Sequence, residues 1–256
     1  MGSYIRLDKY LAGQGIGTRS EVKNLIRRGS VSVAGECVRD FGYKLSEEKL
    51  QEGLEIFIDS ENIGYRKCRY FMLNKPAGVI TATEDKEKKT VMDLFPFSFS
   101  EKRKLFPVGR LDIDTEGLLL VTDDGKLAHQ LLAPKKHVDK CYFVVVQGIV
   151  TEEDVLKFSE GVSGTFQTLP AELKILSTDK EKGVSETEVT IREGKYHQIK
   201  RMFHAVGKEV LYLKRLSMGS LVLDASLAPG EFRKLSEEEV QELHRYIKFR
   251  HSALVP

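Results

Sequence analysis

Tryptophan is absent from the 256-residue chain, and cysteine occurs at only three positions, Cys37, Cys68 and Cys141. Three cysteines that are odd in number and far apart argue against a disulfide framework and against a zinc site, so we expect a reducing, cytoplasmic environment. No apolar run approaches the roughly 20 residues of a membrane span, and residues 1–11 mix charge and apolar groups too evenly for a signal peptide. The apolar content of 41% and the mean hydropathy of −0.28 predict a normal packed core.

Charge of either sign is in little excess, because the net charge is only +2, yet the basic residues are unevenly distributed. Residues 1–44 contain eight basic side chains against four acidic ones, the basic ones being Arg6, Lys9, Arg19, Lys23, Arg27, Arg28, Arg39 and Lys44. Residues 195–215 contain six against one, namely Lys195, Lys200, Arg201, Lys208, Lys214 and Arg215 against Glu209. Local basic patches of this kind favour phosphate-bearing partners even when the net charge is small.

The first 60 residues predict two short helices followed by a pair of strands. The second helix, over residues 18–29, begins with a capping box in which Thr18 and Glu21 satisfy each other's backbone N–H groups. Arg19, Lys23 and Arg27 follow at intervals of four residues and therefore line one helix face. That face is compatible with an ordinary solvated surface, with RNA binding, or with a winged helix-turn-helix that binds DNA.

The remainder of the chain changes pattern after a polar stretch over residues 59–67, which we interpret as a linker. Strands are predicted within residues 69–81, 140–150 and 185–193, and helices over 151–162, 195–207 and 235–247. In the second of these helices Ile199, Met202, Phe203 and Val206 form the apolar stripe. Because strands and helices do not alternate strictly, we expect an α+β fold on a mixed, largely antiparallel sheet.

The stretch GRLDIDTEGLLLVTDDG, residues 109–125, places Asp112, Asp114 and Glu116 directly before a wholly apolar strand. We call residues 112–116 the acidic stretch. It resembles the start of a calcium loop, but the twelfth position is Asp123 rather than Glu and the loop's second half is apolar. It also suits a tight turn, or a carboxylate that attacks the anomeric carbon of a sugar. The residues alone leave these alternatives open.

The same stretch resembles the catalytic signature of bacterial rRNA pseudouridine synthases of the RsuA type. Three further stretches resemble motifs of that family in the same order, namely LNKPAGVIT (residues 73–81), KKHVDKCYFV (135–144) and EGKYHQIKRMFHAVG (193–207). The N-terminal segment resembles the small S4-like RNA-binding domain. The resemblance implies a small S4-like α/β domain over residues 1–60, a linker over 61–67 and a catalytic domain over 68–256.

The resemblance also implies roles for individual residues. Asp112 matches the nucleophilic aspartate, Tyr142 the tyrosine that stacks on the target uracil, and Lys200 the basic partner of the aspartate. Ile199 matches an apolar residue of the base pocket, and Arg110 an arginine that holds the RNA while the base is extruded. We expect Leu118–Val121 to form the floor of that pocket, and His197 and His204 to be neither metal ligands nor catalytic acids. In the first domain Arg6, Lys9, Arg19, Lys23, Arg27 and Arg28 are the expected RNA-binding residues.

The implied reaction is the isomerisation of uridine to pseudouridine in ribosomal RNA, which needs no cofactor and no metal. KYHQIKRMF is similar to the small-subunit type, which predicts 16S rRNA, at a uridine-516-type site, within an assembling subunit. We expect a cytoplasmic, monomeric protein that does not bind membranes. The alternatives are a synthase for 23S rRNA, a non-catalytic RNA-binding assembly factor, and a DNA-binding regulator.

Overall fold

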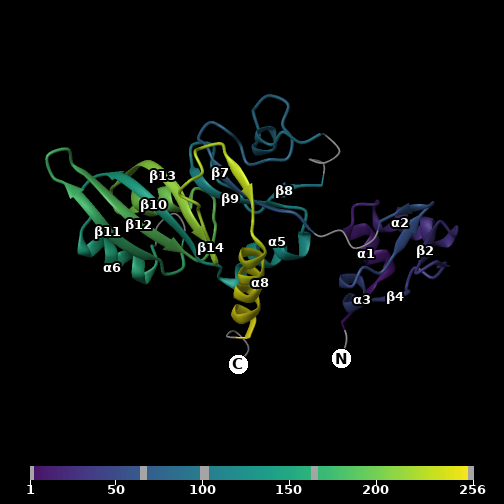
Figure 1. Ribbon diagram of the computed structural model, residues 1–256. Helices are drawn as coiled ribbons and strands as arrows, with labels where there is room; N and C mark the ends of the chain where they lie inside the picture. The colour runs from purple at the N-terminus through teal and green to yellow at the C-terminus, as the bar shows by residue number, and fades with distance from the viewer. Residues whose placement is uncertain (1–2, 64–67, 99–103, 163–166, 253–256) are drawn as a thin grey trace. The chain divides into compact units, whose positions relative to one another are not determined.

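The computed structural model describes residues 3–63, 68–98, 104–162 and 167–252, and it divides the chain into two compact units, Met1–Cys68 and Arg69–Pro256 (Figure 1). In the first unit the strands form a two-stranded sheet, β1–β4, and a four-stranded antiparallel sheet in the order β3-β2-β5-β6. The elements are β1 (Tyr4–Arg6), α1 (Leu7–Gly13), α2 (Arg19–Arg27), β2 (Val31–Val33), β3 (Glu36–Cys37), β4 (Lys44–Ser46), α3 (Glu47–Gln51), β5 (Ile56–Ile58) and β6 (Glu61–Asn62).

Local sequence signals account for much of the first unit. The capping box of α2 is present, with the Thr18 N–H donating to Glu21 Oε2 at 2.7 Å and the Glu21 N–H donating to Thr18 Oγ1 at 3.3 Å. The predicted strand pair is the β2–β3 hairpin, and both residues of its turn, Ala34 and Gly35, have positive φ, as such turns require. The stretch expected to be a linker begins with a strand instead, because Glu61 and Asn62 form β6, which pairs with β5. Residues 64–67 of that stretch lie outside the described residues.

The second unit is built on a nine-stranded sheet in the order β11-β12-β10-β13-β9-β7-β15, with β14 paired to β13 and β8 to β9. The strands are β7 (Tyr70–Lys75), β8 (Phe106–Pro107), β9 (Glu116–Thr122), β10 (Lys140–Gln147), β11 (Glu172–Asp179), β12 (Val184–Ile191), β13 (Glu209–Met218), β14 (Leu221–Val222) and β15 (Phe232–Lys234). Every pairing is antiparallel except β13 with β9. The predicted α+β fold on a mixed, largely antiparallel sheet is confirmed.

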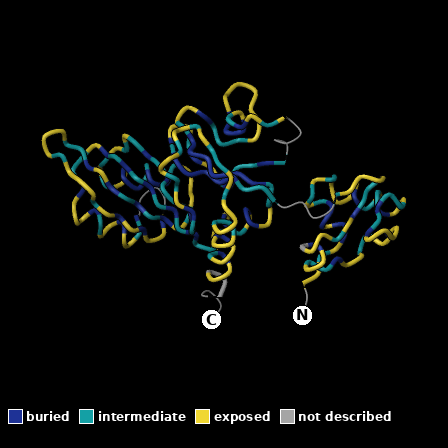
Figure 2. The backbone as a smooth tube through the Cα atoms, in the orientation of Figure 1, coloured by how far each residue is buried: buried dark blue, intermediate teal, exposed yellow. Residues whose placement is uncertain are grey.

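Both faces of this sheet are covered. The helices are η1 (Val91–Leu94), α5 (Gly125–Leu132), η2 (Pro134–Lys136), α6 (Glu152–Glu160), α7 (Gln198–Ala205) and α8 (Glu237–Ser252). Side chains of η1, α6 and α7 pack with Leu119 and Val121 of β9, whereas α5 and α8 pack with Leu118 and Leu120. Successive strand residues point to opposite faces, so a strand buried on both sides is apolar throughout. Figure 2 shows this buried stretch along β7 and β9 in the middle of the unit.

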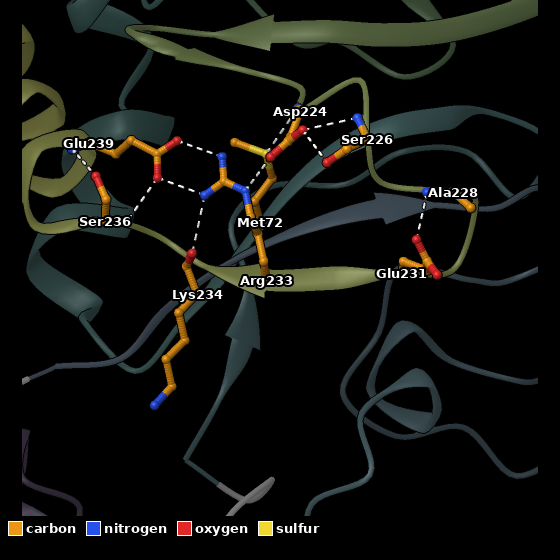
Figure 3. Close-up of polar contacts among 9 residues, drawn as sticks. All are labelled: Met72, Asp224, Ser226, Ala228, Glu231, Arg233, Lys234, Ser236 and Glu239. Atoms are coloured by element: carbon orange, nitrogen blue, oxygen red, sulfur yellow. Dashed lines mark hydrogen bonds and ion pairs between the residues drawn. The ribbon is translucent and has the colours of Figure 1, made fainter.

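A polar cluster fastens the edge strand β15 to its neighbours (Figure 3). The Arg233 guanidinium donates through Nε to Asp224 at 2.6 Å and through Nη1 and Nη2 to the two oxygens of Glu239 at 2.8 Å. Asp224 follows β14, and Glu239 lies in the first turn of α8. The cluster therefore ties β15 to the start of the C-terminal helix.

Among the described residues, no helix is both long and apolar enough to cross a membrane.

Candidate active site

The acidic stretch lies in a loop between β8 and β9, and a buried lysine holds this loop from beneath. Lys75, at the end of β7, has no solvent exposure. Its ammonium donates to the carbonyl oxygens of Asp112 at 3.1 Å and Thr115 at 2.9 Å, and more distantly to that of Ile113 at 3.4 Å. Burial lowers the pKa of Lys75 to about 8, although the nearby carboxylates of the acidic stretch oppose the shift. The ammonium also donates to the Pro76 carbonyl at 3.0 Å, so it holds the backbone on both sides of the contact, after β7 and around Asp112.

The loop is also fastened to the segment after β7. Thr81 Oγ1 donates to the Leu111 carbonyl at 2.8 Å, and the Gly78 N–H donates to the Ile113 carbonyl at 2.8 Å. The Thr115 N–H donates to the Asp112 carbonyl at 3.1 Å and closes a turn. The interpretation of the acidic stretch as a tight turn is therefore correct, and it coexists with a carboxylate that faces a pocket.

Gly117 directly follows the acidic stretch, at a point where β9 and β13 approach each other closely. Its φ is +101°, and a Cβ atom at this position would lie 2.7 Å from the Arg215 backbone nitrogen and still closer to the Arg215 carbonyl oxygen. Gly117 and Arg215 are partners in the parallel register of the two strands. The glycine that resembles the sixth position of a calcium loop is therefore explained by strand packing.

A pocket of about 70 Å³ opens above Asp112, and we call it the first pocket. The five residues to which the resemblance assigns a role in catalysis or substrate binding line it, namely Arg110, Asp112, Tyr142, Ile199 and Lys200. Tyr142 is buried in β10, Ile199 is buried in α7, and Arg110 is exposed at the mouth. The structure thus brings together side chains that are up to 90 positions apart in the sequence.

The apolar walls of the first pocket differ from the prediction. They come from Leu111, Ile191 and Leu213 beside Tyr142 and Ile199. Leu118–Val121 were expected to form the floor, but they are not among the lining residues. They lie inside β9, where their side chains pack against the helices that cover the two faces of the sheet.

Two basic side chains approach Asp112 from the start of α7. The Lys200 ammonium lies 3.8 Å from Asp112 Oδ2, and His197 Nε2 lies 3.6 Å from Asp112 Oδ1. Lys200 bonds more closely to Asp114, at 2.6 Å from each carboxylate oxygen. Partial burial works to raise the pKa of Asp114, but the hydrogen bonds and charge of Lys200 outweigh it and hold that pKa below its usual value. The expected pairing of Lys200 with Asp112 is therefore shared with Asp114.

The three carboxylates of the acidic stretch do not converge on one point. Glu116 accepts a hydrogen bond from the Tyr212 hydroxyl of β13 at 2.7 Å, whereas Asp114 accepts from Lys200 of α7. In the part of the chain that the structure describes, no group of three or more His, Cys, Asp or Glu side chains is arranged to hold a metal ion. Asp112 is the member of the acidic stretch whose carboxylate belongs to the pocket.

Lys75 and His197 belong to the site, and sequence reasoning did not assign them a role in it. Lys75 stands in the quoted stretch LNKPAGVIT, where a lysine inside a buried strand is the available signal. His197 precedes α7 in a left-handed conformation, with φ of +50°, and stacks on the exposed ring of Tyr196. Its backbone conformation is rare outside glycine and is not readable from the spacing of residues.

Of the six predicted RNA-binding residues in the first unit, Arg6 lies in β1, Lys9 in α1 and the other four on α2 or at its C-cap, and all except Lys23 are exposed. The buried carboxylate of Asp8 orders two of them, at 3.1 Å from Arg6 and 3.6 Å from Arg19. The Phe41 ring collects three cations, Arg6, Lys23 and Arg27, at 5.1 to 5.7 Å from its centroid. Lys9 is exposed, and Arg28 bonds to Ser30 and lies 3.5 Å from Asp59.

Comparison with known protein families gives two matches that fall in different units. Residues 69–205, more than half of the chain, match the RNA pseudouridylate synthase family. Residues 5–50 match the S4 domain. The first match contains the acidic stretch, Tyr142 and Lys200, and the second contains the cations around Phe41.

Individual relatives align over nearly their whole length. The chain is 46% identical to the RNA pseudouridine synthase YtzG of Bacillus subtilis, over 94% of this chain and 98% of that protein. It is 39% identical to ribosomal small subunit pseudouridine synthase A of Escherichia coli, over 92% and 98%. It is 38% identical to ribosomal large subunit pseudouridine synthase B of Bacillus subtilis, over 93% and 95%. A crystal structure of a pseudouridylate synthase, 37% identical, superposes with a TM-score of 0.64 over 93% of this chain and 99% of that one.

Proposed function

The chain belongs to the RNA pseudouridylate synthase family, and we propose that it converts a specific uridine of small-subunit ribosomal RNA to pseudouridine with Asp112 as the nucleophile. The observation that carries the proposal is the position of the Asp112 carboxylate in a pocket with an aromatic wall and two basic neighbours. A carboxylate so placed can react at a sugar carbon while the base is held beside it.

The residues of the pocket suit the steps of the reaction. A carboxylate oxygen of Asp112 attacks C1′ of the ribose, and the bond between C1′ and N1 breaks with its electron pair going to the uracil. The uracil turns, C5 attacks C1′, and the ester bond to Asp112 breaks. The C5 proton then leaves to solvent and N1 takes up a proton, which completes the isomerisation. Lys200 and His197 can stabilise the charge of Asp112 before the attack and after its release.

The walls of the pocket retain the detached base. Extruding a base from RNA costs a few kcal/mol, and stacking on an aromatic ring such as Tyr142 returns about 1–3 kcal/mol. Ile199, Leu111 and Leu213 close the pocket with apolar surface. Such surface excludes the water that would otherwise capture the ribose.

The small subunit is the proposed target because KYHQIKRMF is similar to the small-subunit type. Overall identity does not separate the alternatives, since the small-subunit and large-subunit relatives are 39% and 38% identical. A large-subunit target is therefore the second candidate, and both substrates belong in the test.

The test measures tritium release from ribosomal RNA labelled at C5 of uridine, because the new bond to C1′ displaces that hydrogen. Small-subunit RNA is supplied as a protein-bound assembly intermediate, large-subunit RNA is run in parallel, and wild type is compared with Asp112→Asn. We expect release from the small-subunit substrate alone and none from the variant. Release from only the large-subunit substrate would mean that the enzyme modifies large-subunit rather than small-subunit ribosomal RNA. No release from either, with RNA binding intact, would favour a non-catalytic assembly factor.

A further inference from the structure

A second cavity adjoins the first pocket and has a volume of about 270 Å³. Four residues line both spaces, namely Arg110, Tyr142, Gly194 and Lys195. The second cavity extends from this shared wall toward the end of α5 and η2, where Leu131, Leu132 and Pro134 line it. The reaction as described uses none of its remaining residues.

Two buried cations line the second cavity. Lys140, at the start of β10, is 9% exposed, and its ammonium donates to the Val138 carbonyl at 3.0 Å. Arg215 of β13 is 2% exposed, and its Nε donates to the Leu118 carbonyl at 2.7 Å. Arg215 Nη2 is buried and has no hydrogen-bond partner. Among the described residues, no carboxylate lies within ion-pair distance of either side chain.

One carboxylate, that of Glu193, lines the second cavity, and its hydrogen bonds and ion pair are with residues other than Lys140 and Arg215. Glu193 accepts hydrogen bonds from the Leu169 N–H and from Gln198 Nε2, both at 2.9 Å, and forms an ion pair with Lys195 at 3.1 Å. Arg192, also in the lining, pairs with Asp139 at 2.9 Å. Among the described residues, the buried charged side chains of the second cavity that form no ion pair are therefore the cations Lys140 and Arg215.

A buried cation without a counter-ion costs free energy, and binding of an anion offsets this cost. Burial, together with the positive charge of Arg215, lowers the pKa of Lys140 to about 8, although the charges of Asp139 and Glu193 oppose the shift. A guanidinium edge beside an ammonium is a donor set suited to phosphate oxygens. Because Tyr142 separates this donor set from the first pocket, an anion here would lie next to a base held against that ring.

We propose that the second cavity binds a phosphodiester group of the substrate RNA adjacent to the extruded uridine, with Lys140 and Arg215 as its ligands. The inference rests on the proposed function, because it assumes that the first pocket receives the base. A phosphate fixed beside the base would hold the backbone in its extruded geometry through the isomerisation. A free phosphate ion has the same chemistry, so the test separates the two sources.

The test uses the full chain with four probes, namely uridine, its 5′-monophosphate, its 3′-monophosphate and inorganic phosphate. Binding is followed by NMR on protein with carbon-13-labelled lysine side chains, in which the Lys140 signal is the one missing from Lys140→Met. That variant keeps the apolar stem and removes the charge. Lys174→Met, at an exposed position of β11, is the control that removes the same charge away from the cavity. Arg215→Lys provides a second variant that retains a cation and shortens the donor set.

We expect one monophosphate to shift the Lys140 signal and to bind about tenfold more tightly than uridine. The advantage should persist in Lys174→Met, weaken in Arg215→Lys and disappear in Lys140→Met, while uridine binding is unchanged. Equal binding of uridine and both monophosphates, or an advantage that survives Lys140→Met, would overturn the proposal. A Lys140 shift with inorganic phosphate alone would assign the cavity to a free ion and would also overturn it. The Lys140 signal reports this cavity directly, whereas tritium release tests the proposed function, so the two failures are distinguishable.

Discussion

The Lys200 ammonium lies 2.6 Å from both carboxylate oxygens of Asp114 and 3.8 Å from Oδ2 of Asp112. One cation is thus shared between the proposed nucleophile and its acidic neighbour. The Asp114 side chain is 64% exposed, and an exposed pair contributes at most about 1 kcal/mol to stability. The pair therefore contributes little to the free energy of folding of the chain.

This arrangement predicts unequal effects of removing the two partners. Lys200→Met should lower kcat about 10- to 100-fold, because it removes a charged partner of Asp112. Asp114→Asn should lower kcat less than about tenfold, since Lys200 still reaches Asp112. Both variants and their combination are compared by tritium release, with Lys200→Arg as the conservative control. If Lys200→Met has no effect once Asp114 is changed, Lys200 acts only through Asp114.

Local patterns predicted helices and strands but left the role of the acidic stretch open, and the resemblance to pseudouridine synthases selected Asp112, Tyr142 and Lys200. Helical periodicity correctly assigned Ile199 to the buried face of α7, and the capping box of α2 followed from two residues three apart. The hydrogen bonds from Lys75 to the acidic stretch could not be predicted from the sequence, because the carbonyls that accept them are about 40 positions away. Backbone carbonyls carry no residue identity, so no sequence pattern marks them as partners. The same limit applies to the orphaned guanidinium nitrogen of Arg215.

Lys75→Met should loosen the loop that carries Asp112. Its ammonium is fully buried and donates hydrogen bonds to the backbone carbonyls of Asp112 and Thr115, so we expect a loss of about 2–3 kcal/mol in the free energy of unfolding. The rate constant kcat should fall more than KM rises, because the nucleophile is misplaced while the RNA-binding surfaces remain. Urea unfolding and steady-state kinetics measure the two effects, with Lys174→Met as the charge control. Unchanged stability and kcat would show that other interactions hold the loop.

Two glycines with positive φ allow the cost of steric crowding to be measured separately from the cost of backbone strain. Gly117→Ala should destabilise the protein by about 3 kcal/mol or more, because the added methyl group meets the Arg215 backbone. Gly78 has φ of +81°, but no atom lies within 4 Å of the place that an alanine methyl group would take, so Gly78→Ala should cost about 1 kcal/mol of strain alone. Denaturant unfolding of both variants compares them directly. Equal losses would mean that β9 and β13 can move apart without cost.

The cluster around Arg233 predicts a pH dependence of stability (Figure 3). Hydrogen bonds from Ser226 and Arg233 lower the pKa of Asp224 to about 2, and Arg233 lowers that of Glu239 below its usual value. Carboxylates with lowered pKa values stabilise the fold above their ordinary pKa, near 4, and lose this contribution as the pH falls toward 2. Arg233→Gln should therefore be less stable than wild type at pH 6, and the gap should narrow at pH 3. Lys234→Gln, the exposed neighbour, should show no such gap in urea unfolding. A gap independent of pH would assign the effect to packing.

The cations around Phe41 should set RNA affinity and leave the chemistry unchanged. Lys23 and Arg27 lie in the S4-domain match, outside the residues that line the first pocket. Replacing both by alanine should raise KM, leave kcat within about twofold, and reduce the slope of log affinity against log salt by about 1 for each phosphate that is no longer neutralised. Lys174→Ala with Lys180→Ala, exposed on the second unit, is the matched control for net charge. A fall in kcat at saturating RNA would contradict this division of labour, because it would mean that the first unit shapes the geometry of the reacting nucleotide as well as capturing the RNA.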